Sequence, residues 1–212
     1  MCIRDRREAF FGEFRVSLPR TLAARHPERV TVSRGFRIRH PRHIEFAGPD
    51  ARLRCGTHAF GFARGDHGGL LRLEGTLELR GNVQVGVGAS WVVGEGARLV
   101  VGARTYFSPD TRIVAMNGIT IGDDCAISWD VQLLDEDFHE VIVDGQARPT
   151  GAPICIGDHV WIGSRATVLK GAVIPDGTTI ASGAVVSGVF TETGTVLAGC
   201  PAKVVRRGTV WT

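Results

Sequence analysis

The sequence places one histidine in an acidic segment. His139 lies in LLDEDFHEV, which contains four carboxylates, and three of them, Asp135, Asp137 and Glu140, are candidate partners. The pKa of imidazole is close to neutrality, so its unprotonated nitrogen can take a proton from a weak nucleophile such as a hydroxyl. A carboxylate can fix the imidazole tautomer and stabilise the imidazolium that forms. His139 is therefore a candidate general base, and each of the three acids is a candidate for orienting it.

The segment that begins at His139 interrupts an otherwise regular sequence. Residues 139–155 contain two prolines and two glycines, and no hydrophobic register runs through them. His139 stands six residues after Leu133, where a new repeat would begin. A long excursion from a compact repeat usually has a function. We predict a protruding catalytic loop at about 139–155, with the histidine at its base.

The regular part of the sequence has a period of six. Large aliphatic residues recur at this step: Ile156, Ile162, Val168, Ile174, Ile180 and Val186. Small or β-branched residues lie four places after each of the first five: Val160, Ala166, Ala172, Thr178 and Ala184. An α-helix would spread such residues over several sides, and a flat strand has a period of two. Short strands joined by turns do have this period, and they stack into parallel β-helices.

The register continues upstream in a looser form. A step of six links Ile121, Ile127 and Leu133, and Val-Gly pairs beginning at residues 85, 93 and 101 step by eight. We interpret the longer steps as coils with longer corners. The fold class predicted is all-β.

The composition favours a single repeat domain and gives no signal for a membrane or nucleic-acid-binding protein. The chain has 212 residues, 28 glycines and 7% aromatic residues, which suits one domain with many tight corners. It contains no apolar run of 18 residues, so no integral membrane segment is expected, and its start does not read as a secretory signal. Five cysteines without metal spacing indicate a reducing, cytoplasmic protein. Residues 1–64 hold 14 of the arginines against six acids, but no nucleic-acid-binding motif accompanies them.

Four segments are expected along the chain. Residues 1–6, MCIRDR, resemble the translation of a sequencing-library adaptor end and are interpreted as an assembly scar. Residues 7–35 are expected to form an N-terminal cap, residues 36–190 the β-helix, and residues 191–212 a C-terminal tail.

The repeats carry a resemblance to a known family. The segment IGDHVWIGSRATVLKGAVIPDGTTIASGAVVSG (156–188) and the closing AGCPAKVVR (198–206) resemble the hexapeptide-repeat acyltransferases, in particular sugar O-acetyltransferases of the galactoside and maltose type. The resemblance implies a left-handed parallel β-helix, a homotrimer and acetyl-CoA as acyl donor. It also favours Glu140 as the partner of His139.

The resemblance implies further site residues by position. Those expected to contact coenzyme A are Gly163, Ser164, Ser182, Ser187, Lys203 and Arg206. Those expected near the acceptor are Ser108, Asp110 and Asn117. Gly188 stands where the sugar acetyltransferases often have a lysine, which puts one phosphate contact in doubt. No metal is expected, because His139 and His159 lack a third histidine nearby.

The function expected is acetyl-CoA-dependent O-acetylation of a sugar hydroxyl in capsule, exopolysaccharide or lipopolysaccharide synthesis. The acceptor is expected to be a small molecule or a lipid- or nucleotide-linked sugar. Two alternatives stay open: N-acetylation of an amino sugar or antibiotic, and a non-catalytic trimeric scaffold.

Overall fold

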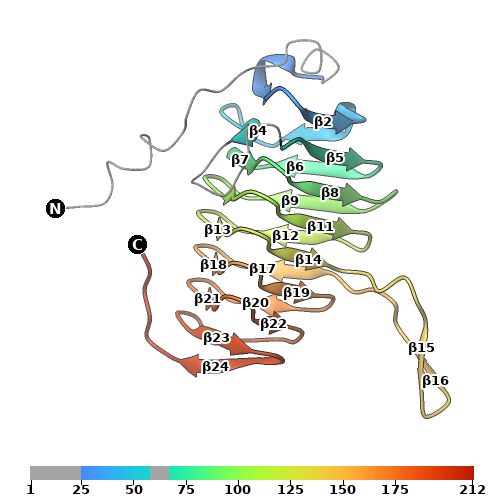
Figure 1. Cartoon of the computed structure of the whole chain (residues 1–212), viewed down its shortest axis with the longest axis vertical. Helices are drawn as coiled ribbons and strands as arrows, with labels where there is room; N and C mark the ends of the chain where they lie inside the picture. The colour runs from blue at the N-terminus through green and yellow to red at the C-terminus, as the bar shows by residue number, and fades with distance from the viewer. Residues whose placement is uncertain (1–24, 58–66) are drawn as a thin grey trace.

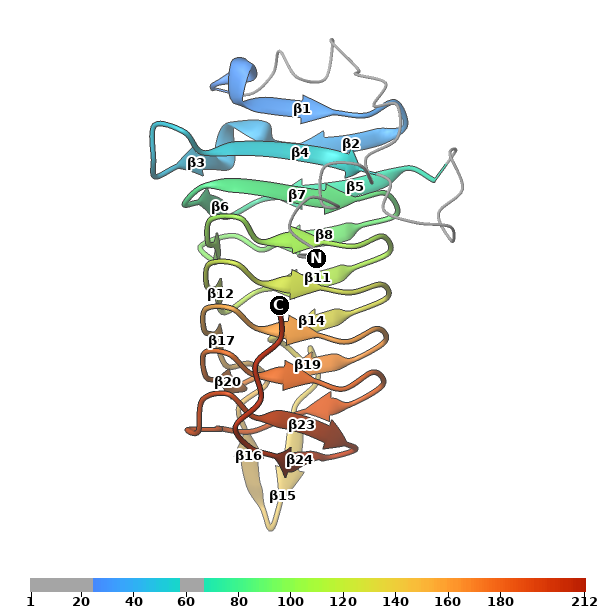
Figure 2. The ribbon, with the colours of Figure 1, turned by 90° about the vertical axis from the view of Figure 1, so that its left-hand side faces the viewer.

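The computed structural model describes residues 25–57 and 67–212, and these form a left-handed β-helix with three parallel sheets as its sides (Figures 1 and 2). The chain passes from the first sheet to the second and then to the third in each coil. We call the turns between them the first corner (first to second sheet), the second corner (second to third sheet) and the third corner. The described residues make seven coils, numbered from the N-terminal end.

The strands divide among the sheets as follows. The first sheet contains β1 (Val30–Val32), β4 (Arg52–Thr57), β7 (Asn82–Gly86), β10 (Tyr106–Phe107), β13 (Ala126–Ile127), β18 (Trp161–Ile162), β21 (Thr179–Ile180), β23 (Val196–Gly199) and the antiparallel β24 (Ala202–Arg206). The second contains β2 (Phe36–Arg39), β5 (Gly69–Leu73), β8 (Ser90–Val93), β11 (Arg112–Ala115), β14 (Gln132–Leu134), β19 (Thr167–Leu169) and β22 (Val185–Val186). The third contains β3 (Ile44–Phe46), β6 (Thr76–Leu79), β9 (Arg98–Val101), β12 (Ile119–Ile121), β17 (Ile154–Ile156) and β20 (Val173–Ile174). Two short 3₁₀ turns, η2 (Pro27–Arg29) and η3 (Pro41–His43), lie in the first coil.

The period of six is the spacing of inward side chains. All six large aliphatic residues of 156–186 are at most 3% exposed, and the five residues at the small positions are at most 1% exposed. Strands that are stacked in register bury these side chains in one continuous core. The predicted all-β, β-helical fold is confirmed.

The longer coils hold larger side chains. One coil takes 22 residues between Val85 and Phe107 but 18 between Ile162 and Ile180. Buried Trp91 packs edge-on against Phe107, with ring centroids 4.5 Å apart, and its Nε1 donates to Thr111 Oγ1 at 3.2 Å. A longer side is needed because an indole and a phenyl ring occupy more of the triangular interior than valine and alanine do.

The segment boundaries differ from those expected. The β-helix already begins at Val30, because β1 pairs in parallel with β4. The predicted tail contains β23 and β24, so the first sheet continues into it. The scar predicted at 1–6 and most of the cap predicted at 7–35 lie outside the described residues.

Candidate functional site: the hairpin at coil 5

The chain leaves the β-helix once at the second corner, in coil 5. After β14 it forms an antiparallel hairpin of β15 (Val141–Val143) and β16 (Gln146–Arg148), then returns as β17. Asp144 and Gly145 connect the two strands with φ of 51° and 73°, the positive values that a tight two-residue turn requires. The hairpin projects from the body and extends past the C-terminal coils (Figure 1). We call residues 135–140 and 149–152 the base of the hairpin and residues 141–148 its arm.

A buried carboxylate fixes the base to coil 4. Asp135 has no exposed surface, and its two oxygens accept the backbone N–H groups of Met116, Asn117 and Gly118 at 2.7, 2.8 and 2.7 Å. The backbone oxygen of Asp135 also accepts the N–H of Ala152, on the returning leg, at 3.0 Å. Hydrogen bonds to an ionised acceptor are stronger than neutral ones. Asp135 therefore holds the corner together, and its oxygens do not orient the histidine.

A lysine fixes the base to coil 6. Lys170 Nζ donates to the carbonyl oxygens of Pro149 and Thr150 at 2.6 and 3.1 Å, and it lies 2.7 Å from Asp137 Oδ2. An ammonium group has three donors, and these contacts match that number. One side chain thus joins the outgoing leg, through Asp137, to the returning leg. Of the three candidate acids, Asp137 contacts Lys170 through its side chain.

The histidine is oriented by a backbone carbonyl. His139 is exposed, and its Nδ1 lies 3.2 Å from the carbonyl oxygen of Asp137. A carbonyl oxygen only accepts, so Nδ1 carries the proton and Nε2 keeps a free lone pair in the neutral imidazole. Among the contacts of the described residues, exposed Glu140 makes none with His139. The expected pairing of these two side chains is therefore absent from this arrangement.

Glu136 closes the base from the side. Asn117 Nδ2 donates to Glu136 Oε2 at 3.0 Å, and the backbone N–H of Phe138 donates to Oε1 at 3.0 Å. The Asn117 hydrogen bond lowers the pKa of Glu136 below its ordinary value, and the bonds from Phe138 and Thr150 and the charge of Lys170 act in the same direction. Glu136 thus remains a carboxylate at neutral pH and completes the anchoring.

Three of the predicted coenzyme A residues meet at the first corner. Ser164 and Ser182 occupy successive coils there, where the Gly183 N–H donates to Ser164 O at 2.9 Å. A Cβ on Gly163 would lie 2.7 Å from Ser182 N, so only glycine allows this approach of the two coils. Ser182 is exposed. At this predicted coenzyme A site, the structure presents backbone groups of the corner and the exposed Ser182 hydroxyl.

The other predicted donor contacts lie elsewhere. Ser187 follows β22 and is exposed at the second corner, on the other side of the second sheet. Lys203 and Arg206 are exposed on β24, at the C-terminal end of the first sheet. The structure therefore groups the two cations with the end of the first sheet and separates Ser187 from both sets.

The predicted acceptor residues are divided between two corners. Ser108 is buried, and Asp110 occupies the first corner, where its Oδ1 lies 3.6 Å from His67 Nδ1. Only Asn117 lies at the second corner with His139, where it bonds to the hairpin base. Of the three residues, Asn117 is the one that the fold brings to the candidate general base.

The end of the chain covers part of the first sheet, which sequence reasoning did not predict (Figure 2). The Trp211 ring stacks on His159 with centroids 4.2 Å apart, and its Nε1 donates to the His159 carbonyl at 2.8 Å. Trp161, which is 42% exposed, donates from Nε1 to Ser128 Oγ at 3.1 Å. The only sequence signal for this contact is a tryptophan in an otherwise unpatterned tail.

The described residues provide neither a metal-binding cluster nor a membrane-spanning helix. In the described part of the chain, no group of three histidine, cysteine or acidic side chains could hold a metal ion. Across residues 25–57 and 67–212, no helix has the length and apolarity needed to cross a membrane. Buried Cys125 has its pKa raised to about 11 by desolvation, so it is a packing thiol rather than a nucleophile.

The hexapeptide repeat of the coils has a counterpart in a known protein family. The bacterial transferase hexapeptide family, described as having six repeats, matches residues 156–188. The match lies in the C-terminal coils, so the resemblance to hexapeptide transferases rests on this part of the chain.

Two individual proteins are similar to this chain in sequence. The chain is 30% identical over 138 residues to an uncharacterized 24.8 kDa protein in the cps region of Klebsiella pneumoniae, covering 65% of this chain and 61% of that protein. It is 29% identical over 147 residues to WbbJ of Escherichia coli K12, named as a lipopolysaccharide biosynthesis O-acetyl transferase, covering 61% and 74%. The chain thus spans less than two thirds of the Klebsiella protein.

A solved structure shares the architecture. The polysialic-acid-specific acetyltransferase NeuO superposes with a TM-score of 0.57 at 20% identity, covering 86% of this chain and 78% of that one. At this identity the likeness establishes the fold. The activity must be argued from the site.

Proposed function

We propose that the protein is an acetyl-CoA-dependent O-acetyltransferase that acts on a sugar hydroxyl. His139 Nε2 takes the proton of the acceptor hydroxyl as its oxygen attacks the thioester carbonyl. The carbon–sulfur bond then breaks, and the proton on His139 passes to the departing coenzyme A thiolate. Backbone N–H groups would hold the oxyanion in the transition state. No acyl-enzyme is required, because both substrates meet at the histidine.

The observation that carries this proposal is the contact between His139 Nδ1 and the Asp137 carbonyl oxygen. The Asp137 carbonyl leaves Nε2 as the free lone pair, and the side chain is exposed on a base anchored by Asp135 and Lys170. A general base needs an unprotonated nitrogen, access to substrate and a fixed position. An unused surface histidine would not need this anchoring.

The donor site supports a shared active site. Ser164 and Ser182 lie at the first corner, whereas His139 lies at the second, and the second sheet separates the two corners. If coenzyme A follows the first corner toward Lys203 and Arg206, its thiol end does not reach His139 of the same chain. A homotrimer that sets the first corner of one chain against the second corner of another would complete the site. Cations on β24 suit the nucleotide phosphates.

The acceptor class rests on the relatives together with the hairpin. WbbJ is named for lipopolysaccharide biosynthesis, and the Klebsiella protein lies in a cps region. We infer that the acceptor is a sugar in capsule, exopolysaccharide or lipopolysaccharide synthesis, presented in the cytoplasm as a small molecule or on a lipid or nucleotide carrier.

The test is a competition assay with labelled acetyl-CoA. Hexosides, nucleotide sugars, serine and aminoglycoside-type amines are offered together, and the products are analysed by mass and by their stability to mild base. An ester on a sugar hydroxyl, formed with stoichiometric thiol release, is the expected result. Predominant amide formation would replace this proposal with the N-acetyltransferase. Binding of acetyl-CoA without turnover on any acceptor would favour the scaffold.

A further inference from the structure

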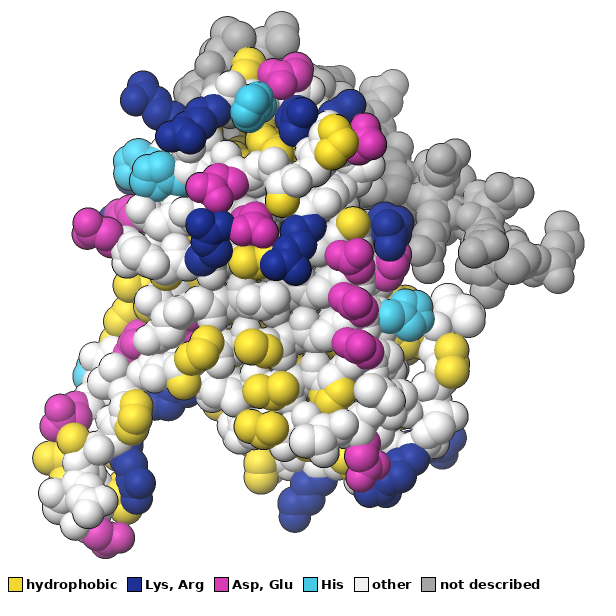
Figure 3. All heavy atoms as spheres, turned by 180° about the vertical axis from the view of Figure 1, so that it is seen from behind, with side chains coloured by type: hydrophobic (Ala, Val, Ile, Leu, Met, Phe, Trp, Pro, Cys, Tyr) yellow, Lys and Arg dark blue, Asp and Glu magenta, His cyan; other side chains and the backbone are white. Residues whose placement is uncertain are grey.

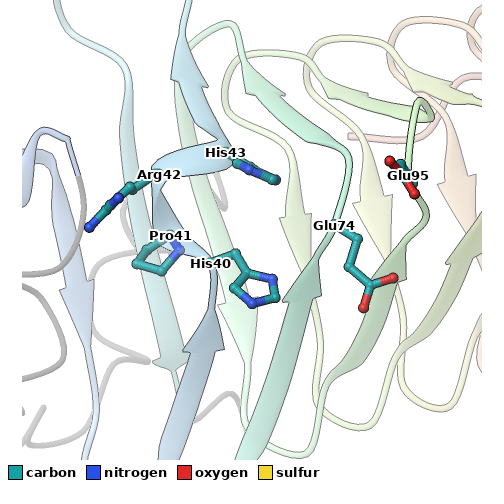
Figure 4. A pocket seen from close by; sticks show the side chains of 6 residues that line it. All are labelled: His40, Pro41, Arg42, His43, Glu74 and Glu95. Carbon is teal, nitrogen blue, oxygen red and sulfur yellow. The ribbon is translucent and has the colours of Figure 1, made fainter.

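A hollow lies on the same corner as His139, toward the N-terminal end. It has a volume of about 630 Å³ and is lined by His40, Pro41, Arg42, His43, Glu74 and Glu95 (Figure 4). This volume falls in the range of small-molecule sites in proteins, about 300–1,000 Å³. The lining comes from the second corners of coils 1, 2 and 3, so the hollow is a feature of the stacked corners rather than of one loop.

The backbone of the hollow turns sharply at His40. This residue has φ of 56° and ψ of 52°, a left-handed conformation that corner residues such as Arg104 and Arg165 also adopt, and the turn η3 begins immediately after it. This conformation sets the His40 and His43 rings 6.1 Å apart at the rim. On coil 2, a Cβ at Gly75 would lie 2.2 Å from the Gly94 carbonyl oxygen, so the next coil approaches closely only because this residue is glycine.

The lining of the hollow contains both hydrogen-bond donors and hydrogen-bond acceptors. His40, Arg42 and His43 lie at one end, and Glu74 and Glu95 lie on the next two coils (Figure 4). Arg72 holds Glu74 with a 2.6 Å contact from Nη2 to Oε1. Charges of both signs also intermix over the N-terminal coils as a whole (Figure 3). A site with alternating imidazole, guanidinium and carboxylate groups suits ligands that are dense in hydroxyls, and it gives no net attraction to a polyanion.

The second corner connects this hollow to the hairpin. Successive coils place Glu74, Glu95, Met116 with Asn117, and then the hairpin base along one edge. Figure 1 shows β2 and the hairpin toward that same edge. Met116 is 36% exposed, and its thioether is the atom group that a Cβ on Gly94 would strike. Neighbouring strands lie about 4.8 Å apart, so coils 1 and 5 are separated by about 19 Å along the axis. A single sugar ring does not span this distance, but a short oligosaccharide does.

We propose that the hollow at His40–Glu95 is a distal subsite for an uncharged oligosaccharide acceptor whose reactive hydroxyl lies at His139. Apolar faces of the sugar rings would pack along Met116, and their hydroxyls would bond to the imidazoles and carboxylates of the hollow. The inference rests on the proposed function, because it requires a sugar acceptor at the hairpin base. It adds that the efficiency of acetylation depends on the length of the acceptor.

The experiment uses the full chain and the sugar that the competition assay identifies, or uncharged glucose oligomers if no sugar is acetylated. Acceptors of one to six residues of that sugar are compared by kcat/KM in wild-type protein. The hollow is altered by His43→Ala with Glu95→Gln, and separately by His40→Asn, because asparagine tolerates the left-handed backbone. The matched control is His26→Ala with Glu28→Gln, which removes the same residue types from coil 1 outside the hollow. Circular dichroism and thermal melting confirm that each variant is folded.

Wild-type kcat/KM should rise about tenfold from one sugar residue to the length that reaches coil 1. The hollow variants should lose that gain through a higher KM for long acceptors, with unchanged kinetics on the monosaccharide and unchanged KM for acetyl-CoA. The control should keep the gain. Equal rates for all lengths in wild-type protein, or an undiminished gain in both hollow variants, would overturn the subsite. Preference for an acidic oligosaccharide of equal length would overturn the uncharged class.

A binding measurement separates this inference from the proposed function. His139→Ala protein should bind the six-residue acceptor more tightly than the monosaccharide, as followed by calorimetry, while turning neither over. If no sugar is acetylated by wild-type protein and no length-dependent binding occurs, both proposals fail. Length-dependent binding that is lost in the hollow variants, without acetylation of any sugar, would keep the subsite and reject the catalytic role of His139.

Discussion

The base and the arm of the coil 5 hairpin are built by opposite means. At the base, the buried Asp135 carboxylate and the Lys170 ammonium tie the two legs to coils 4 and 6 through charge-assisted hydrogen bonds. Along the arm, residues 141–148 are all exposed, and Val141 and Ile142 are 52% and 65% exposed. The base, which carries His139, is therefore held firmly in place. The arm beyond it exposes apolar side chains.

This difference shows how a repeat protein can hold an exposed histidine in a fixed position without disturbing its core. The β-helix supplies amides and a lysine from neighbouring coils, which hold the insertion at its root. The arm then carries little of the stability of a single chain, and its apolar side chains are free for contact with another chain. The base should therefore be sensitive in activity and folding, and the arm in assembly.

The largest effect should come from His139→Ala. Loss of a general base should lower kcat on the order of 10²–10⁴-fold, while acetyl-CoA binding is retained. Steady-state kinetics with thiol detection and a separate binding measurement test both parts. Glu140→Gln serves as the comparison and should cost less, since the Asp137 carbonyl orients the imidazole. Wild-type turnover in His139→Ala would remove the base from the mechanism.

The next effect should appear in stability with Asp135→Ala. This change leaves three backbone N–H groups at Met116, Asn117 and Gly118 without their acceptor in a buried corner, which should cost about 3 kcal/mol of unfolding free energy. Urea denaturation measures it. Gln146→Ala on the exposed arm is the matched control and should change stability by less than about 0.5 kcal/mol. Equal losses in the two variants would erase the contrast between base and arm.

Lys170→Met should have a smaller effect that is mainly catalytic. The methionine keeps much of the apolar stem but frees the Pro149 and Thr150 carbonyls and Asp137, so His139 is held less firmly. We expect about a tenfold lower kcat with an unchanged KM for acetyl-CoA, and faster amide exchange across residues 137–150. Lys170→Arg should restore part of the rate. A drop in thermal stability with no change in kcat would assign the lysine a structural role only.

The arm should respond in assembly rather than in folding. Ile142→Ser removes an apolar side chain that is 65% exposed in one chain, so the stability of that chain should hardly change. If the arm packs against a partner in the trimer, the variant should dissociate at higher protein concentration than wild type. Analytical ultracentrifugation over a dilution series measures this shift. A wild-type protein that is monomeric and fully active would contradict the shared site.

The smallest effect should be a local opening of the hairpin base as pH falls. The pKa of Glu136 is lowered by its hydrogen bonds with Asn117 and Phe138, so this carboxylate stabilises the folded base above the ordinary carboxylate pKa. That contribution should be lost only as pH falls through the lower, folded-state value. Exchange of the Phe138 amide should therefore rise below the usual range of glutamate titration in wild-type protein. In Glu136→Gln it should be fast already at neutral pH and show no such step.

Sequence reasoning reached the fold and the position of the histidine because both depend on local spacing. The spacing of six predicted the buried residues from Ile156 to Val186, and the break in that spacing after Leu133 predicted the position of the hairpin. The family resemblance favoured Glu140 as the partner of His139, and the structure instead places the Asp137 carbonyl beside the imidazole. The resemblance also grouped Ser108 with Asn117, although the fold places them at different corners.

The repeat spacing by itself determined that this chain stacks into a β-helix, since only inward side chains at every sixth position can fill so narrow a core. The tertiary structure alone decided what surrounds His139. Lys170 lies 33 residues after Asp137 in sequence but one coil away in space, and Asp135 meets amides that precede it by 17 to 19 residues. The physical reason is that side-chain partners at a corner are set by the stacking of coils. An insertion changes their separation along the sequence without changing their separation in space.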